Sequence, residues 1–134
     1  MKVDEIMTKK LEIISADASI YDAIERMIDK RIRSLLVKPR DEHDVNGVIT
    51  VRDIVHKALG KNLDLNKTKV SEIMSKPLVC IDKGTDVEHA VNLMTKFNIT
   101  RVFVSEGKEI VGIVSLLDVM SSALIRRARE GRGA

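Results

Sequence analysis

The sequence contains two copies of one unit, and this internal duplication restricts the fold more than any other feature. The segment Val3–Lys9 (VDEIMTK) matches Val70–Lys76 (VSEIMSK) at an offset of 67 residues, and 11 of the 35 positions from residue 3 to residue 37 are identical at that offset. The second copy then has a loop that is two residues shorter, and an offset of 65 pairs Gly47–Val55 with Gly112–Met120. A collinear match with one small gap is typical of repeat architectures, in which each copy forms the same structural unit.

The repeats predict domains at residues 1–60 and 70–127, a polar linker at 61–69 and a basic tail at 128–134. A single copy of about 60 residues buries only about 60% of its surface and is marginally stable alone. Two copies that pack sheet against sheet remove this deficit. The duplication therefore predicts pseudo-twofold symmetry, with a groove between the copies on each side.

Each copy is expected to contain a strand, a helix, two more strands and a closing helix. In the first helix, Ser19 is a candidate N-cap, and apolar residues recur at helical spacing from Ile20 to Ile28. The expected strands lie at 11–14, 34–37 and 45–50 in the first copy and at 78–81, 101–104 and 110–115 in the second, with closing helices at 51–59 and 116–129. The predicted fold class is α/β (α+β), with a small β-sheet packed against two helices in each domain.

The composition excludes several protein classes. Aromatic residues are limited to Tyr21, Phe97 and Phe103, so the cores must be aliphatic. The single cysteine, Cys80, lies in an expected strand as a small core residue, and no histidine–cysteine cluster indicates a metal. Neither a membrane-spanning apolar run nor a signal peptide is present, so we expect a soluble, cytoplasmic protein.

The net charge of +3 is concentrated at one end of the chain. Residues 126–134 (RRAREGRGA) carry four arginines and one glutamate, so residues 1–125 sum to zero. A basic tail without aromatic neighbours supports only weak, salt-sensitive contact with nucleic acid. Nucleic-acid binding through this tail is therefore kept only as an alternative function. A purely structural oligomerisation module is a further alternative.

Both copies carry the pattern Gly-h-h-[Thr/Ser]-x-x-Asp after the third strand, where h is apolar. The first copy has Thr50 and Asp53 in this pattern, and the second has Ser115 and Asp118. One interpretation is structural. Thr50 and Ser115 would cap the following helices in capping boxes, with the aspartates in the favoured first turn. Gly47 and Gly112 would then allow a strand start or a bulge.

Each copy has the order strand, helix, strand, strand, helix, with this motif after its third strand, and so resembles a cystathionine β-synthase (CBS) domain. Two such copies in tandem resemble a stand-alone prokaryotic CBS pair, or Bateman module. The resemblance covers residues 3–127. It implies a regulatory module that binds AMP, ADP, ATP or S-adenosylmethionine in the grooves between the domains and signals to an unknown regulated protein. In this family the motif's Thr or Ser contacts phosphate at a helix N-terminus and its Asp holds the ribose. By resemblance, Thr50 with Asp53 forms one site and Ser115 with Asp118 the other.

The family's adenine contacts come from around the first and second strands. The matching residues are Met7, Glu12, Ile32, Arg33 and Ser34 in the first copy and Met74, Val79, Ile99, Thr100 and Arg101 in the second. Glu12 places a charge where Val79 is apolar, so the Ser115–Asp118 site ranks first. Arg101 requires an anionic partner if it is buried, either a ligand phosphate or an acidic side chain.

The closing helix of the second copy carries a long apolar stripe, which includes Leu116, Val119, Met120, Ala123 and Leu124. In CBS pairs such helices join two pairs, so we expect a homodimer through the closing helices. The alternative is a stripe covered within the monomer. No nucleophile–base pair, paired carboxylates or glycine-rich phosphate loop is evident, so we expect neither enzymatic activity nor a cofactor beyond the regulatory ligand.

Overall fold

The computed structural model describes residues 1–76 and 78–131, and it divides into two compact units. The N-terminal unit comprises Glu12–Leu78, and the C-terminal unit comprises Met1–Leu11 together with Val79–Ala134. Each unit contains one three-stranded sheet with helices, as the sequence predicts. The compact units differ from the sequence copies at two segments, 1–11 and 70–78, because each packs in the unit built by the other copy. We call these the exchanged segments. Arg132, the last arginine of the basic tail, lies outside the described residues.

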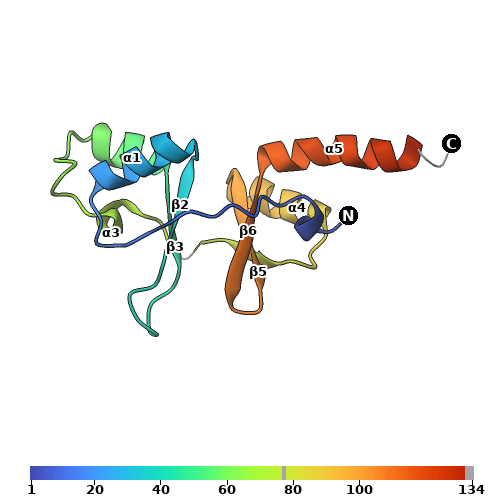
Figure 1. The fold of residues 1–134 in the computed structure, drawn as a ribbon, viewed down its shortest axis with the longest axis horizontal. Helices are drawn as coiled ribbons and strands as arrows, with labels where there is room; N and C mark the ends of the chain where they lie inside the picture. Colours follow the sequence, from blue (N-terminus) through green and yellow to red (C-terminus); the bar gives the residue numbers. More distant parts are fainter. Residues whose placement is uncertain (77, 132–134) are drawn as a thin grey trace. The chain divides into compact units, whose positions relative to one another are not determined.

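In the N-terminal unit, the sheet has the order β1-β2-β3, with β1 parallel and β3 antiparallel to the central strand. Helix α1 begins as predicted, because the Ser19 hydroxyl accepts a hydrogen bond from the Asp22 amide at 3.0 Å. The elements are β1 (Ile13–Ile14), α1 (Ile20–Lys30), β2 (Ser34–Val37), β3 (Gly47–Thr50), α2 (Val51–Asp53), the π-helical turn η2 (Ile54–Leu59) and α3 (Val70–Ile73) (Figure 1).

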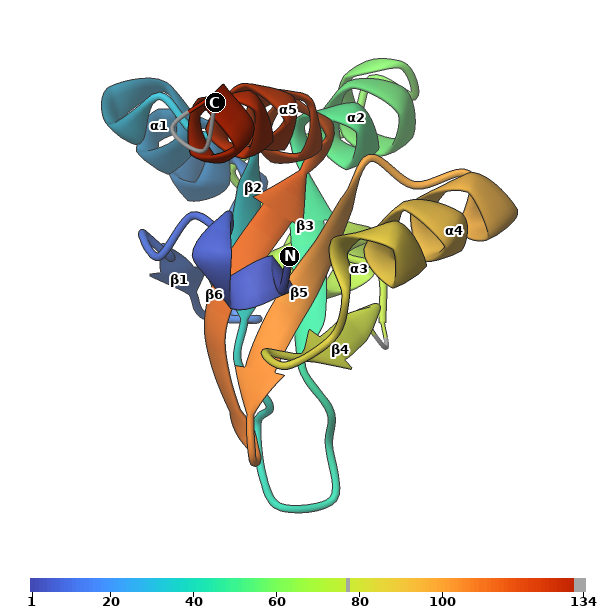
Figure 2. The same ribbon diagram turned by 90° about the vertical axis from the view of Figure 1, so that its right-hand side faces the viewer.

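The C-terminal unit repeats this topology, with the order β4-β5-β6, a parallel first pair and an antiparallel second pair. Strands β5 and β6 form a long hairpin, seen in Figure 2, whose turn contains Gly107 at a φ of +62°. A left-handed residue in a tight hairpin turn is the position where glycine carries no steric cost. The elements are the 3-10 helix η1 (Val3–Glu5), β4 (Cys80–Asp82), α4 (Val87–Phe97), β5 (Arg101–Glu106), β6 (Glu109–Ser115) and α5 (Leu116–Gly131).

Each unit has its own aliphatic core between the sheet and the helices. The N-terminal core includes Ile20, Leu35 and Ile49, and the C-terminal core includes Val87, Val102 and Val114. The exchanged segments contribute to these cores. Val70 and Ile73 of α3 belong to the first, and Val3 and Ile6 belong to the second.

One expected core residue is on the surface. Cys80 is exposed, and the sequence prediction of a small core residue is wrong at this position. Strand β4 alternates between its two faces, so the burial of Ile81 turns its neighbour Cys80 outward. Among the described residues, no helix is both long enough and apolar enough to cross a membrane.

Candidate functional site

In the C-terminal unit, the motif forms the junction between strand β6 and helix α5. The Ser115 amide donates to the Asp118 carboxylate at 2.9 Å, and the Asp118 amide donates to the Ser115 hydroxyl oxygen at 3.2 Å. The Ser115 hydroxyl also donates to Asp118 Oδ2 at 3.0 Å. These reciprocal bonds are a capping box, and they hold the Asp118 carboxylate at the first turn of a 16-residue helix.

The N-terminal unit builds the same junction between β3 and α2. The Thr50 amide donates to Asp53 Oδ2 at 3.0 Å, and the Asp53 amide donates to the Thr50 hydroxyl oxygen at 3.1 Å. The structural interpretation of the motif is therefore confirmed in both copies. A capping box does not prevent a ligand from binding, because the second carboxylate oxygen keeps lone pairs available.

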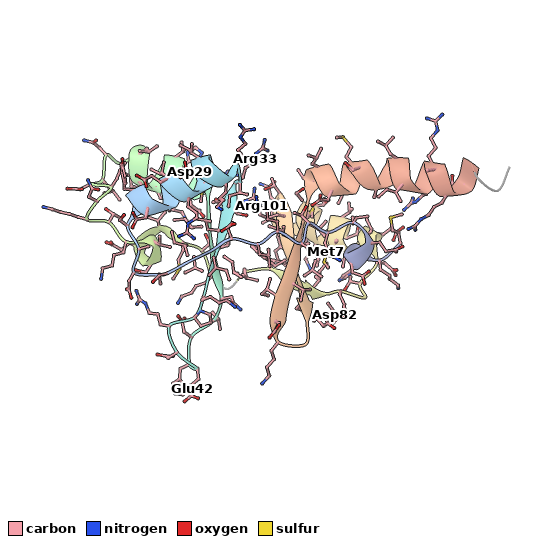
Figure 3. The ribbon with its side chains drawn as sticks, in the orientation of Figure 1. Met7, Asp29, Arg33, Glu42, Asp82 and Arg101 are labelled. Atoms are coloured by element: carbon pink, nitrogen blue, oxygen red, sulfur yellow. The ribbon has the colours of Figure 1, made fainter. Side chains whose placement is uncertain are left out.

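The glycine of each motif lies where an exchanged segment pairs with the third strand of the sheet through an antiparallel bridge. Thr8 pairs with Ile113 through two backbone hydrogen bonds of 2.8 and 3.0 Å, and Met7 (Figure 3) lies just before this bridge. A Cβ atom at Gly112 would overlap the Met7 side chain and would lie 3.2 Å from the Thr8 carbonyl oxygen. The glycine is thus needed for close approach of another backbone. Gly112 is also the register partner of Val104, and the next pair is Ser105 with Ile110, so the bulge expected at this glycine lies directly beside it.

The same arrangement recurs in the N-terminal unit. Ser75 pairs with Val48 through two backbone hydrogen bonds of 2.9 Å each. A Cβ atom at Gly47 would lie 3.1 Å from both Met74 Sδ and the Ser75 carbonyl oxygen. Gly47 also begins β3, as the sequence predicts. The compact units thus group Met74 with Thr50 and Asp53, and Met7 with Ser115 and Asp118, whereas the sequence copies group them the other way.

The candidate residues at the start of the second strands lie beside the motifs. Ser34 is the register partner of Thr50, and Arg101 is the register partner of Ser115. Arg33 is exposed between α1 and β2 (Figure 3), whereas Arg101 is half-buried. The structure therefore brings the basic residue of each copy close in register to its hydroxyl-bearing cap.

The residues just before these strands accept a hydrogen bond from the first amide of each closing helix. The Arg33 carbonyl accepts from the Val51 amide at 3.0 Å, and the Thr100 carbonyl accepts from the Leu116 amide at 3.2 Å. Ile32 and Ile99 pack against the two cores. Since the first and third amides of α5 already have acceptors within the chain, its N-terminus offers an anion fewer free donors than a bare helix end.

The first-strand candidates lie further from the motifs. The Glu12 carbonyl accepts from the Leu36 amide, and the Val79 carbonyl accepts from the Phe103 amide, each at 2.9 Å. Leu36 and Phe103 lie two positions along their strands from Ser34 and Arg101. Glu12 and Val79 are therefore placed beside the second strands through backbone contacts.

The aspartates of the two motifs have different neighbours. Lys57 Nζ lies 3.0 Å from Asp53 Oδ1, whereas the Thr8 hydroxyl lies 3.2 Å from Asp118 Oδ1 and 3.4 Å from Oδ2. The sequence prediction named neither Thr8 nor Lys57. Two signals point to them: Thr8 matches Ser75 in the repeat, and Lys57 follows Asp53 at the i,i+4 spacing of helical ion pairs.

The same repeat is recognised in a family of known proteins. The CBS-domain model matches residues 3–60 and again residues 70–124. The chain belongs to the CBS-domain family. It holds two CBS domains in tandem, and in the residues described, no group of three or more His, Cys, Asp or Glu is arranged to hold a metal ion.

Three similar proteins illustrate the family. Protein MJ0450 of Methanocaldococcus jannaschii is 31% identical over 88% of this chain and 64% of its own length. The structure of a hexameric CBS-CP12 protein from bloom-forming cyanobacteria has a TM-score of 0.85 and 36% identity, over 90% of this chain and 66% of its own. The CBS domain pair of protein MJ0100, solved with 5′-methylthioadenosine and S-adenosylmethionine, has a TM-score of 0.76 and 31% identity, over 90% of this chain and 98% of its own. This chain thus spans just under two thirds of the first two proteins.

Proposed function

We propose that this chain is a regulatory module that binds an adenosine-type ligand, such as AMP, ADP, ATP or S-adenosylmethionine, and signals to a partner protein by a conformational change. The observation that carries the proposal is the Asp118 carboxylate, held at the start of α5 by Ser115 and contacted by the exposed hydroxyl of Thr8. A carboxylate fixed in this way accepts two hydrogen bonds from the hydroxyls of a ribose. The adenosine-type ligands of the MJ0100 pair support this ligand class.

In this proposal each neighbouring residue has a definite role. Asp118 accepts the ribose hydroxyls, and Ser115 with the start of α5 contacts the phosphate or the other polar end of the ligand. Arg101, the register partner of Ser115, supplies positive charge. Met7, Val79 and Ile99 offer the apolar contacts that suit a purine. In the N-terminal unit, the equivalent set is Glu12, Ile32, Arg33, Ser34, Thr50, Asp53 and Met74.

Signalling requires that the ligand bind one conformation more tightly than another, since equal affinity for both shifts nothing. Each unit takes its first segment from the other sequence copy, so the chain links the two units at two places. We propose that ligand binding biases the arrangement of the units and so changes the surface offered to the partner. The module itself is proposed to regulate without catalysing a reaction.

Asp118→Ala tests this function directly. AMP, ATP and S-adenosylmethionine are titrated into the full chain by calorimetry and thermal denaturation. A bound ligand at about 100 times its Kd stabilises the wild-type fold by about 2.7 kcal/mol. That free energy raises the Tm by several degrees in a chain of this size. We expect Asp118→Ala to lose this shift, because the ribose acceptor is gone.

Asp29→Ala is the matched control, since it removes an exposed carboxylate in α1 and is expected to bind normally. The proposal is contradicted when none of the three ligands raises the wild-type Tm. It is equally contradicted when Asp118→Ala, Asp53→Ala and the double variant all bind as the wild type does.

We also propose that two chains form a homodimer through α5. Leu117, Met120 and Leu124 are 64%, 67% and 70% exposed, so these apolar residues of α5 are not covered by the described part of the chain, although Val119 of the predicted stripe is. Val119 and Ser122 face the unit instead. The hexameric state of the cyanobacterial protein supports assembly of CBS pairs, and the stripe supports α5 as the contact.

The tail offers less support for nucleic-acid binding. Arg126 lies 3.7 Å from Glu88, and Arg129 lies 3.0 Å from Glu5. The Lys2 amide hydrogen bond, together with the Arg129 guanidinium, lowers the pKa of Glu5. Arginines already paired with carboxylates contribute less to binding phosphates, because each pair must first be broken.

A further inference from the structure

We infer that the two motifs are not equivalent, and that the adenosine-type ligand binds at Asp118 of the C-terminal unit while Lys57 closes Asp53 of the N-terminal unit. This inference rests on the function proposed above and adds to it the number and the place of the ligands. It is carried by the contacts of one lysine, which the second copy of the repeat lacks.

Both oxygens of the Asp53 carboxylate are already engaged. Oδ2 accepts a hydrogen bond from the Thr50 amide at 3.0 Å, and Oδ1 forms an ion pair with Lys57 Nζ at 3.0 Å. The Asp53 side chain is only 13% exposed. A ribose that approached this carboxylate would have to displace a cation from a largely buried anion, which is more costly than displacing water.

Lys57 is anchored at more than one point. Besides Asp53, its ammonium group donates to the Ile73 carbonyl oxygen at 3.3 Å and to the Ser75 hydroxyl at 3.5 Å. The ammonium group thus pairs with the motif carboxylate and hydrogen-bonds to two residues, Ile73 and Ser75, that follow the linker. Lys57 lies in the π-helical turn η2, whereas the corresponding part of α5 is a regular α-helix. The lysine therefore bridges the motif and the exchanged segment 70–78, with a side chain that is 44% exposed.

The C-terminal unit has a serine at the corresponding position. The offset of 65 aligns Lys57 with Ser122, whose hydroxyl donates to the Val119 carbonyl oxygen of its own helix. The contact that replaces the lysine is the hydroxyl of Thr8, an exposed residue, at 3.2 and 3.4 Å from the two Asp118 oxygens. A neutral hydroxyl at this distance marks a position where a ribose hydroxyl can take its place.

The test counts ligands on the full-length chain. AMP, ATP and S-adenosylmethionine are titrated by calorimetry into the wild type, Asp118→Asn and Asp53→Asn. We expect one ligand per chain in the wild type, lost in Asp118→Asn and kept in Asp53→Asn. Lys57→Met, which retains the apolar stem but removes the charge, is expected to tighten binding at Asp53 by about tenfold or more and so to add a second ligand.

Two further variants make the result specific. Lys57→Met combined with Asp53→Asn is expected to return to one ligand per chain. Lys61→Met removes an exposed lysine in the following turn and is expected to leave the count at one. If Lys57→Met does not fold, as judged by its thermal transition, the comparison of Asp118→Asn with Asp53→Asn still decides which motif binds.

Three outcomes overturn the inference while leaving the proposed function intact. They are two equal ligands per wild-type chain, a single ligand lost in Asp53→Asn rather than in Asp118→Asn, and weaker binding in Lys57→Met, which would make Lys57 a ligand contact. A wild type that binds none of the three ligands contradicts the proposed function itself, and the inference falls with it.

Discussion

Asp44 anchors the loop between β2 and β3 through several hydrogen bonds. Its carboxylate accepts from Lys76 Nζ, from the Arg40 amide at 3.0 Å and from the Val45 amide at 2.9 Å. The Lys76 hydrogen bond is the largest cause, and together these contacts lower the pKa of Asp44 to about 2. Lys76 belongs to the exchanged segment 70–78, so Asp44 links the loop to the segment that pairs with β3 at Ser75.

Because the pKa of Asp44 is lower in the folded state, its contribution to stability is present above the unfolded value and is lost as the pH falls toward 2. We expect the free energy of unfolding to fall less steeply between about pH 4 and pH 2 in Asp44→Asn than in the wild type. Denaturant unfolding at several pH values measures this slope. Asp29→Asn is the control, and parallel slopes for Asp44→Asn and the wild type would argue against the assignment.

At the same scale, the motif residues were predictable and their partners were not. Thr50, Asp53, Ser115 and Asp118 are local capping boxes, which need only residues three apart in the chain. Lys57 has the right spacing for an ion pair with Asp53, but a helical lysine is more often solvated. Thr8 reaches Asp118 from 110 residues away, and no local rule connects residues so distant in sequence.

At the scale of elements, strands and long helices followed from periodicity. β2 occupies Ser34–Val37 as predicted, and the other strands agree within a few residues. The short helices η1 and α3 were not predicted, because four or fewer residues carry no helical period. α5 extends to Gly131 rather than residue 129, and the helix expected at 51–59 becomes α2 and the π-helical turn η2. The exchange of the first segments was also missed, because matched copies give no information on which copy a segment joins.

Gly112→Ala tests the close approach of the N-terminal segment to β6. The new methyl group overlaps the Met7 side chain and approaches the Thr8 carbonyl oxygen. We expect overpacking to cost about 1–3 kcal/mol of unfolding free energy, measured by denaturant titration. Met7→Ala should remove much of this cost, so a double-mutant cycle should show strong coupling.

Gly131→Ala serves as the control for this cycle, because a Cβ at Gly131 has no neighbour within 4 Å. Gly112→Ala with wild-type stability would refute the close approach. Additive effects of Met7→Ala and Gly112→Ala would show that the cost arises elsewhere in the junction.

At the scale of the whole molecule, the duplication gives two copies of one fold but unequal chemistry. The first copy has the lysine-closed aspartate and a short closing helix, and the second has an aspartate bound by a hydroxyl and the 16-residue α5. The two copies can differ in this way because both keep the apolar core positions and the capping box, and the difference lies at Lys57 and its counterpart Ser122. We therefore assign ligand binding and assembly, both as proposals, to the same C-terminal unit.

Assembly through α5 makes a prediction about mass. Leu117, Met120 and Leu124 follow one another at i, i+3 and i+7 and are exposed, so two chains that bury these stripes together gain apolar contact. We expect light scattering to give twice the 15.0 kDa chain mass for the wild type and a single chain mass for Leu117→Glu with Leu124→Glu. Leu63→Glu changes an exposed leucine of the N-terminal unit and should remain dimeric. A wild type that is monomeric, or a double variant that stays dimeric, would exclude α5 as the contact. A stripe buried between two chains requires that the two glutamates in α5 dissociate the dimer and that Leu63→Glu does not.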